Sequence, residues 1–298
     1  SLIYPLLSIA DCNSVAKRLN ERYFETGACS NEEAAFSCSG IVLHSIETDS
    51  NNIKQLPTSG SCDKTSKVPW CPGADKISRK VVSFSYLKHD VTASYGFPVF
   101  PVRTGTLGYI FKPNSIKNNY LCAYPIDAIT YTRGDCGCAP SHEMECAILD
   151  NEEAVLSSSD FLNRYQKEKK LNRLNMCSFG GSKSQFDAMN QSAYSIASNS
   201  DPHNNLNPFC HTKDLSRCLA VNELILKAWY DINYKDIPIE AFFYMISDSS
   251  IYKEQEKSKT IALKLAEKFP THVPAVGIKI QNIYDEHNSQ GPFVCEGN

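Results

Sequence analysis

The chain has no marked excess of one charge and no long apolar run, and both absences narrow the choice of partners. Its 30 Lys and Arg residues stand against 33 Asp and Glu residues, for a formal net charge of -3. Proteins that bind nucleic acid or anionic membrane surfaces generally carry a basic face, so no nucleic-acid partner is expected. No apolar stretch approaches the roughly 20 residues that cross a bilayer, so no membrane span is expected either.

The apolar start of the chain is also too short to be an anchor. The run LIYPLLSIA at 2–10 cannot span a bilayer and lacks a preceding basic residue, so it is not a complete targeting signal. We therefore expect the chain to begin after a removed signal peptide.

Cysteine is the residue type that the chain has in excess. The 13 cysteines are spread along the chain and do not form the paired CxxC knuckles of structural zinc sites. This pattern predicts long-range disulfides formed in an oxidising compartment, so we expect a secreted, extracellular protein with at least ten cysteines in intramolecular bonds. Their pairing cannot be read from the sequence. The cysteines are Cys12, Cys29, Cys38, Cys62, Cys71, Cys122, Cys136, Cys138, Cys146, Cys177, Cys210, Cys218 and Cys295.

One run has the composition of a zinc site. CGCAPSHEMEC brings together Cys136, Cys138, His142 and Cys146. Disulfide formation is the better explanation in a secreted, cysteine-rich chain, so no metal is predicted. No cysteine lies in a run typical of a papain-like nucleophile either.

Hydrophobic periodicity predicts a helix and then mainly strands in the first half of the chain. Val15, Leu19 and Tyr23 recur at helical spacing within 13–25. Residues 81–87 alternate, which places Ser83 and Ser85 on one face of a strand with Leu87. Other strands are predicted at 38–46, 107–113 and 120–126, and 47–79 is predicted to be a long loop held by its cysteines.

The second half of the chain alternates between helical and strand patterns. Apolar residues three and four apart predict helices at 158–171, 219–232 and 254–269, and apolar or alternating runs predict strands at 238–246 and 273–280. No internal repeat or low-complexity linker is visible. We therefore expect a single disulfide-rich α+β domain over 1–298 with a mainly antiparallel β core.

Six runs, taken in order, resemble the halovibrin family of secreted bacterial proteins. The most distinctive is LCAYPIDAITYTRGDCGC at 121–138, because Pro-Ile-Asp, Arg and a Gly-Cys pair rarely occur together at this spacing. The others are FSCSGIVLH, VSFSYLKHD, GYIFKP, VNELILKAW and PIEAFFYM. Members of that family are described as extracellular enzymes that cleave NAD, and they were first reported as ADP-ribosyltransferases.

The resemblance implies an NAD glycohydrolase that cleaves NAD to nicotinamide and ADP-ribose, with NAD as substrate and no cofactor. Two alternatives stay open. A secreted ADP-ribosyltransferase toxin would pass the ribosyl group to a host protein, and a non-enzymatic, disulfide-rich secreted protein would only bind a partner.

The activity also implies a comparison with the ADP-ribosyltransferase fold. In that fold an Arg ends the first core strand, a strand with an aromatic-Ser-x-Ser run follows, and a later strand supplies an acid. Here IVLH ends in His44 where the halovibrin pattern has Arg, VSFSYL carries Ser83 and Ser85, and PIEAFFY carries Glu240.

Cleavage of the bond between nicotinamide and ribose develops positive charge on the ribose, which a carboxylate stabilises. Three acids are candidates for this role. Glu240 follows Pro238 in a predicted strand, Glu223 lies in the predicted helix 219–232, and Asp127 follows an apolar strand. Their ordinary alternatives are an exposed strand Glu, a solvated helix face and a turn-capping Asp.

The diphosphate and ribose need polar partners. Arg133 can pair bidentately with phosphate oxygens, although it can equally pair with Asp127 or Asp135. His44 can hydrogen-bond ribose but cannot grip a diphosphate as Arg does, and a core or surface histidine is its ordinary alternative.

Other candidates for substrate binding lie beside these residues. Ser83 and Ser85 form a small polar strip if they face a ligand, and otherwise bond to backbone or water. Asn222 precedes Glu223 in the family pattern. Tyr86 and Tyr131 can stack on nicotinamide or adenine, or simply pack in the core.

Overall fold

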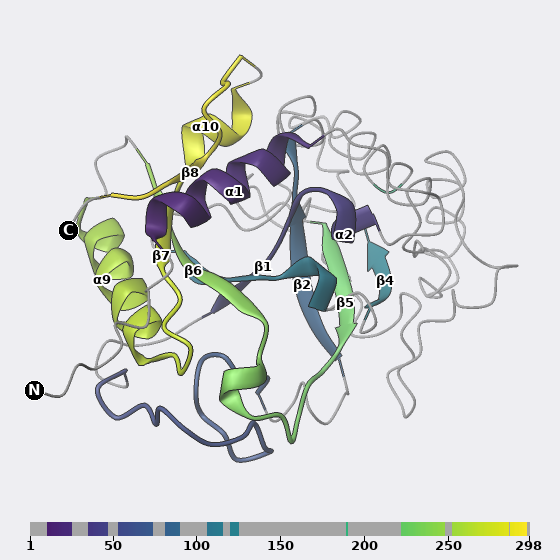
Figure 1. Ribbon diagram of the computed structural model, residues 1–298, viewed down its shortest axis with the longest axis vertical. Helices are drawn as coiled ribbons and strands as arrows, with labels where there is room; N and C mark the ends of the chain where they lie inside the picture. Colours follow the sequence, from purple (N-terminus) through teal and green to yellow (C-terminus); the bar gives the residue numbers. More distant parts are fainter. Residues whose placement is uncertain are drawn as a thin grey trace, which may run out of the picture.

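The computed structural model describes residues 11–25, 35–46, 53–73, 81–89, 106–115, 120–124, 189, 222–247, 252–285 and 287–296. Eight strands within these ranges form one sheet in the order β4-β5-β2-β1-β3-β6-β7-β8 (Figure 1). Every neighbouring pair is antiparallel except β6 and β7, which run parallel. The expected α+β architecture with a mainly antiparallel core is confirmed.

The strands are β1 (Ile41–Ile46), β2 (Val81–Leu87), β3 (Leu107–Phe111), β4 (Tyr120–Tyr124), β5 (Glu223–Lys227), β6 (Ile239–Ile246), β7 (Ala275–Lys279) and β8 (Phe293–Val294). The α-helices are α1 (Cys12–Phe24), α2 (Ala35–Cys38), α9 (Tyr252–Lys268) and α10 (Ile280–Tyr284), and the 3-10 helices are η1 (Pro113–Ser115) and η6 (Tyr234–Asp236). No helix in the described ranges is long and apolar enough to cross a membrane.

Helix α1 covers one face of the sheet. Its apolar residues recur every three or four positions, so Val15, Leu19 and Tyr23 lie on one side and are buried. They pack against strand residues such as Leu43 and Phe243. Asp11 caps the helix by accepting a hydrogen bond from the backbone N–H of Asn13 at 3.3 Å. Figure 1 shows α1 lying across the strands.

Helix α9 and the loop 53–73 cover the other face. Leu265 of α9 and Trp70 of the loop share one core with Phe84 and Phe242 of the sheet. Within the loop, the described residues after Ile53, which is helical, form turns and bends and one bridge from Ser61 to Asn233. The loop predicted from the sequence is therefore confirmed over this range.

Two disulfides join described cysteines. Cys12 at the start of α1 bonds Cys295 after β8, and Cys62 bonds Cys71 within the loop 53–73. Cys38 is disulfide-bonded as well. The first bond closes a sequence separation of 283 residues and the second a separation of 9, so one joins the two ends of the described chain and the other staples a single loop.

Several predicted elements agree closely with the structure. The predicted strand 81–87 is β2, the helix 13–25 is α1 and the helix 254–269 is α9, each to within two residues at either end. The strand predicted at 38–46 starts later, at Ile41, because Ala35–Cys38 form a helical turn and Gly40 takes a positive φ of 72°. The helix predicted at 158–171 lies outside the described residues.

The helix predicted at 219–232 is wrong, because this segment contains strand β5. Glu223, Leu224, Ile225 and Leu226 are all buried, and β5 pairs with β2 on one side and with β4 on the other, so it is an internal strand covered on both faces. A strand buried on both faces is a short continuous apolar run. Such a run cannot be distinguished from a helix by periodicity alone.

Candidate functional site

Strands β1 and β2 pair over only a short stretch. Beyond it, each strand pairs with a different neighbour. Backbone pairing covers Ile41–Leu43 of β1 and ends where Leu43 lies opposite Ser85. From Phe84 back to Val81, β2 pairs with β5, whereas β1 pairs with β3 from Leu43 to Ile46. Backbone pairing between β1 and β2 therefore stops just before His44.

The imidazole of His44 lies where the pairing between β1 and β2 stops. Its Nδ1 lies 2.6 Å from the backbone oxygen of Ser83, and because a carbonyl can only accept, Nδ1 must carry the proton of this bond. The ring packs at 5.1 Å from the ring of Phe84 and 5.3 Å from that of Tyr109. A neutral His44 ring then presents an acceptor at Nε2, which suits a sugar hydroxyl.

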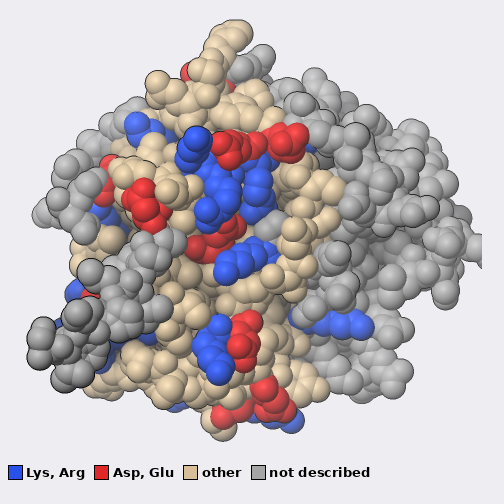
Figure 2. Space-filling view, viewed as in Figure 1, with Lys and Arg blue, Asp and Glu red and all other residues tan. Residues whose placement is uncertain are grey.

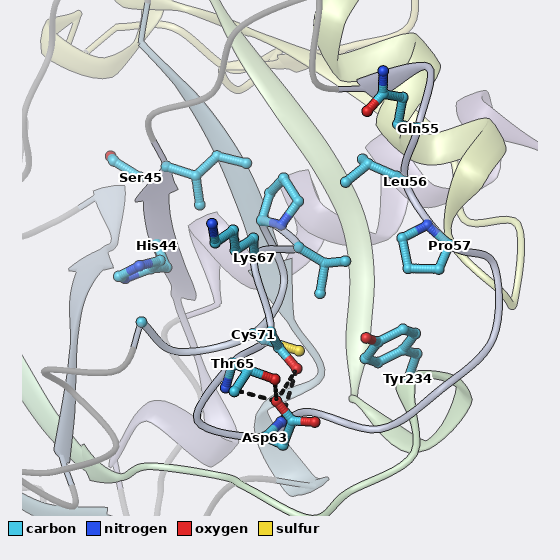
Figure 3. A pocket seen from close by; sticks show the side chains of 15 residues that line it. His44, Ser45, Gln55, Leu56, Pro57, Asp63, Thr65, Lys67, Cys71 and Tyr234 are labelled. Carbon is cyan, nitrogen blue, oxygen red and sulfur yellow. Dashed lines mark hydrogen bonds between the residues drawn. The ribbon is translucent and has the colours of Figure 1, made fainter.

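A cavity of about 900 Å³ lies at this end of β1. Its walls come from His44, Ser45 and Ile46 on one side and from the loop 53–73 on the other, with Tyr234 on the side of the loop away from His44 (Figure 3). We call it the β1 pocket. The hydroxyl of Ser45 is buried there and has no hydrogen-bond partner among the residues that the structure describes.

The loop wall of the β1 pocket is firmly anchored. Besides the disulfide, the backbone N–H of Cys62 donates to Ile232 at 2.9 Å, and the indole N–H of Trp229 donates to the backbone oxygen of Trp70 at 3.3 Å. Trp70 itself is fully buried. These contacts tie the loop to the connection between β5 and β6.

Asp63 organises the turn that follows Cys62. Its Oδ1 accepts from the hydroxyl and the backbone N–H of Thr65, both at 2.7 Å, and from the hydroxyl of Ser66 at 3.1 Å. The hydrogen bond from the Thr65 side chain is the main cause that holds the pKa of Asp63 below its usual value, because it favours the charged form. This carboxylate is therefore committed to its own loop.

A second polar group lies on the opposite side of β2 from β1. Val81–Phe84 pair with Lys227–Leu224, and the same register extended by one residue sets Glu223 beside Ser85. Both side chains are buried, at 6% and 9% exposure. Because side chains of opposed strand residues share one face, Glu223 joins the polar strip that the alternation predicts for Ser85.

Asn222 keeps this register. Its side-chain Oδ1 accepts from the backbone N–H of Tyr86 and its Nδ2 donates to the backbone oxygen of Tyr86, both at 2.8 Å. Asn222 is 1% exposed. Since both polar ends of its side chain bind backbone, the structure gives Asn222 a role in positioning β5 against β2.

Tyr86 packs in the core in this structure. The side chain is 2% exposed, and its hydroxyl donates to the backbone oxygen of Ser39 at 3.2 Å. A Cβ atom at Gly40 would lie 2.5 Å from the ring of Tyr86, so only glycine permits this contact. The ring faces Gly40, which makes it part of the turn that leads into β1.

Glu240 is held by two arginines of α1. Ile110 pairs with Ala241 and Phe111 with Ile239, so Glu240 lies at an irregularity of the ladder, without a partner residue on β3. Its Oε1 accepts from Nε of Arg18 at 2.8 Å and its Oε2 from Arg22 at 3.1 Å. Both oxygens of this buried carboxylate are therefore engaged.

Arg22 links this ion pair to the start of β1. It also donates to the backbone oxygen of Gly40 at 2.7 Å. Burial lowers the pKa of the Arg22 guanidinium, and the carboxylate of Glu240 acts in the opposite sense. Figure 2 shows basic and acidic side chains gathered over α1 on this face.

The other predicted site residues cannot be placed. Asp127, Tyr131 and Arg133 lie outside the described residues, as do Cys136, Cys138, His142 and Cys146. Within the described ranges, no group of three or more His, Cys, Asp or Glu residues is placed to hold a metal ion.

Sequence reasoning missed the loop side of the β1 pocket. Asp63, Thr65 and Lys67 were not candidates, although the order Asp-Lys-Thr-Ser at 63–66 is typical of a turn closed by its own aspartate. It also missed Arg18 and Arg22, since nothing in the local pattern of α1 relates them to a residue more than 200 positions later.

Comparison with known proteins adds no relative. No protein-family model, curated protein or solved structure matches the chain. The halovibrin family therefore stays a prediction from the sequence runs.

Proposed function

We propose that the protein hydrolyses NAD to nicotinamide and ADP-ribose, with Glu223 as the carboxylate beside the ribose. The observation that carries the proposal is the strand order β5-β2-β1. It brings side by side a strand that begins with an acid, a strand with two serines and a strand with His44 near its end. The comparison with the ADP-ribosyltransferase fold names three such elements, and the proposal has His44 in place of its Arg and takes the acid from β5 rather than from Glu240 of β6.

The proposed ribose site lies on the face of the sheet that α1 covers. Leu43 of β1 packs in the core beneath α1 and lies opposite Ser85, and opposed strand residues share one face. Ser85 and its neighbour Glu223 on β5 therefore face α1, whereas the ring of His44 and the β1 pocket lie on the face that the loop 53–73 covers.

Glu223 suits the chemistry better than Glu240. As nicotinamide leaves, positive charge builds up on the ribose ring, and a nearby carboxylate lowers the energy of that state. The carboxylate of Glu240 already faces Arg18 and Arg22, so its charge is largely balanced before a substrate arrives. Glu223 is buried at the start of β5, and the register of Leu224 opposite Phe84 makes Ser85 its neighbour on β2.

The remaining groups have supporting roles in the proposal. Asn222 holds Glu223 in register through Tyr86. Water then attacks the ribose carbon that nicotinamide has left.

The test is release of nicotinamide from NAD by the purified, oxidised protein. The proposal expects steady release with free ADP-ribose as the second product. Parallel reactions with added acceptor proteins distinguish hydrolysis from transfer, because transfer would leave ADP-ribose covalently bound to protein. If no nicotinamide is released in either reaction, the protein is not an NAD-cleaving enzyme and the binding alternative gains.

A further inference from the structure

Helix α1 holds the turn that leads into β1. The backbone oxygen of Arg22 accepts from the N–H of Gly40 at 2.8 Å, and Nη2 of Arg22 donates to the backbone oxygen of Gly40 at 2.7 Å. One residue of α1 therefore binds both backbone polar groups of Gly40. Only 19% of the Arg22 side chain is exposed, so water competes little for the bond from the guanidinium.

The same turn holds the side chain of Tyr86. The hydroxyl of Tyr86 donates to the backbone oxygen of Ser39 at 3.2 Å, and a Cβ atom at Gly40 would lie 2.5 Å from the ring. Gly40 also has a φ of 72°, which side chains rarely allow. Because the α-carbon of Gly40 lies directly against the ring, a shift of this turn moves Tyr86.

The backbone of Tyr86 in turn holds the start of β5. The side chain of Asn222 accepts from its N–H and donates to its oxygen, both at 2.8 Å. Asn222 is followed directly by Glu223. A path of direct contacts thus runs from Arg22 to Glu223, and Gly40, Tyr86 and Asn222 along it are all buried.

The two arginines of α1 differ in their relation to this path. Both pair with Glu240, Arg18 at 2.8 Å and Arg22 at 3.1 Å. Arg18 is half exposed and bonds only to Glu240 among the described residues. Arg22 uses Nη1 for Glu240 and Nη2 for Gly40, so its bond to the turn does not depend on the carboxylate.

We propose that Arg22 is a positioning residue for Glu223. It fixes the turn at Gly40, the turn fixes Tyr86, and the side chain of Asn222 carries that position to the next residue. The role of Glu223 as the catalytic carboxylate rests on the proposed function, whereas the link between α1 and β5 does not. Helix α1 then supports the site as well as covering the sheet.

The double variant Arg22→Met/Glu240→Gln tests the link, with Glu240→Gln as its reference. Removing both charges leaves no buried charge without a partner, and the reference keeps the bond from Arg22 to Gly40. The first measurement is amide hydrogen exchange at Tyr86, whose N–H donates to Asn222. Exchange should be about 10- to 100-fold faster in the double variant, the usual effect of losing one hydrogen bond from a charged donor.

The N–H of Phe293 is the matched control for exchange. It donates to Oδ1 of Asn20 in the same kind of bond, and Asn20 also belongs to α1. Its exchange rate should be the same in the double variant and in the reference.

The second measurement is turnover of NAD. In the double variant kcat should fall up to about 100-fold below that of Glu240→Gln, with KM nearly unchanged, because a displacement of about 1 Å can cost that much. Arg22→Lys keeps a charge beside Glu240 if the double variant does not fold. It should show the same two effects, since an ammonium lacks the planar fork that reaches both partners.

The outcomes separate this inference from the proposed function. Equal acceleration of exchange at Tyr86 and Phe293 would show that Arg22 only secures α1 as a whole, and would overturn the inference. Unchanged exchange at Tyr86 would overturn it too, as would faster exchange at Tyr86 with an unchanged kcat. If exchange at Tyr86 responds in a protein that releases no nicotinamide, the link stands and the proposed function fails.

Discussion

Asn222 forms with Tyr86 the two hydrogen bonds that one strand residue forms with its neighbour, but it uses its side chain for both. Oδ1 accepts from the N–H and Nδ2 donates to the oxygen of Tyr86, each at 2.8 Å. The pair extends the ladder between β5 and β2 by one position, which is the position beside Glu223. Asn222 therefore fixes the position of the neighbouring Glu223, the proposed catalytic carboxylate, against β2.

Replacement of Asn222 should lower both the stability of the fold and the turnover of NAD, and a control variant can tell the two effects apart. Asn222→Ala leaves the N–H and oxygen of a buried backbone position unpaired, which costs about 1–3 kcal/mol. Because Glu223 is the next residue, kcat for nicotinamide release should fall while KM for NAD changes little. The measurements are denaturant unfolding and steady-state kinetics.

Asn20 provides the matched control. Its side chain forms the same two bonds with the backbone of Phe293, at 2.9 and 2.8 Å, on the far strand β8. Asn20→Ala should therefore lose a comparable amount of stability and keep its kcat. An equal fall of kcat in both variants would mean that Asn222 acts only through overall stability.

The ion pairs of Glu240 should contribute to folding. Glu240→Gln leaves the partly buried Arg22 without its counter-charge, and breaking the pair should cost up to about 3–5 kcal/mol, the loss for a fully buried pair. Arg18 is half exposed, so the smaller part of this loss comes from its contact. The free energy of unfolding by urea measures the effect.

Glu21→Gln is the control for that variant. Glu21 pairs with Lys17 on the same helix at 3.9 Å, but both side chains are exposed, so the change should stay within about 0.5 kcal/mol. If Glu240→Gln is as stable as Glu21→Gln, the charge of Arg22 does not depend on Glu240 for its stabilisation, and this account of the ion pair is wrong.

The two described disulfides should have different effects. By chain entropy, the bond from Cys12 to Cys295 stabilises by up to about 5 kcal/mol and the shorter one by about 2.6 kcal/mol. The double variant Cys12→Ser/Cys295→Ser should therefore lose more stability. The free energy of unfolding by urea measures the loss in each double variant. The opposite ranking of the two losses would contradict the chain-entropy account.

Acid should loosen the turn after Cys62. Hydrogen bonds, first of all from the side chain of Thr65, lower the pKa of Asp63 in the folded protein. A lowered folded pKa means that the stabilising contribution is complete above the unfolded pKa and is lost as pH falls through the folded one. An NMR titration should place the pKa of Asp63 below 3.8, and Thr65→Val should raise it. A pKa of Asp63 that Thr65→Val leaves unchanged would contradict this account of the turn.

The sequence predicted the helices and strands whose apolar residues recur with a clear period. Helix α1 shows its apolar spacing, and β2 shows its alternation, with Phe84 and Leu87 in different cores. Strand β5 could not be recognised, because burial of Glu223–Leu226 by β2 and β4 removes the alternation that marks a strand. The structure therefore changes the setting of Glu223 from a helix face to a strand.

The environment of each candidate acid depended on distant residues. Glu240 is buried by Arg18 and Arg22, which lie 222 and 218 positions earlier in the chain. The ladder irregularity at Glu240 depends on the register of β3, and the sequence contains no local sign of it.

The turnover number for nicotinamide release, compared between Glu223→Gln and Glu240→Gln, tests the central claim most directly. Both proteins are measured at a temperature where circular dichroism shows them folded. The account predicts a loss of about 100-fold in kcat for Glu223→Gln with KM nearly unchanged, because the carboxylate acts on charge that appears as the bond breaks. It predicts a wild-type kcat for folded Glu240→Gln. Wild-type turnover in Glu223→Gln together with loss of turnover in folded Glu240→Gln would contradict the account and move the catalytic acid to β6.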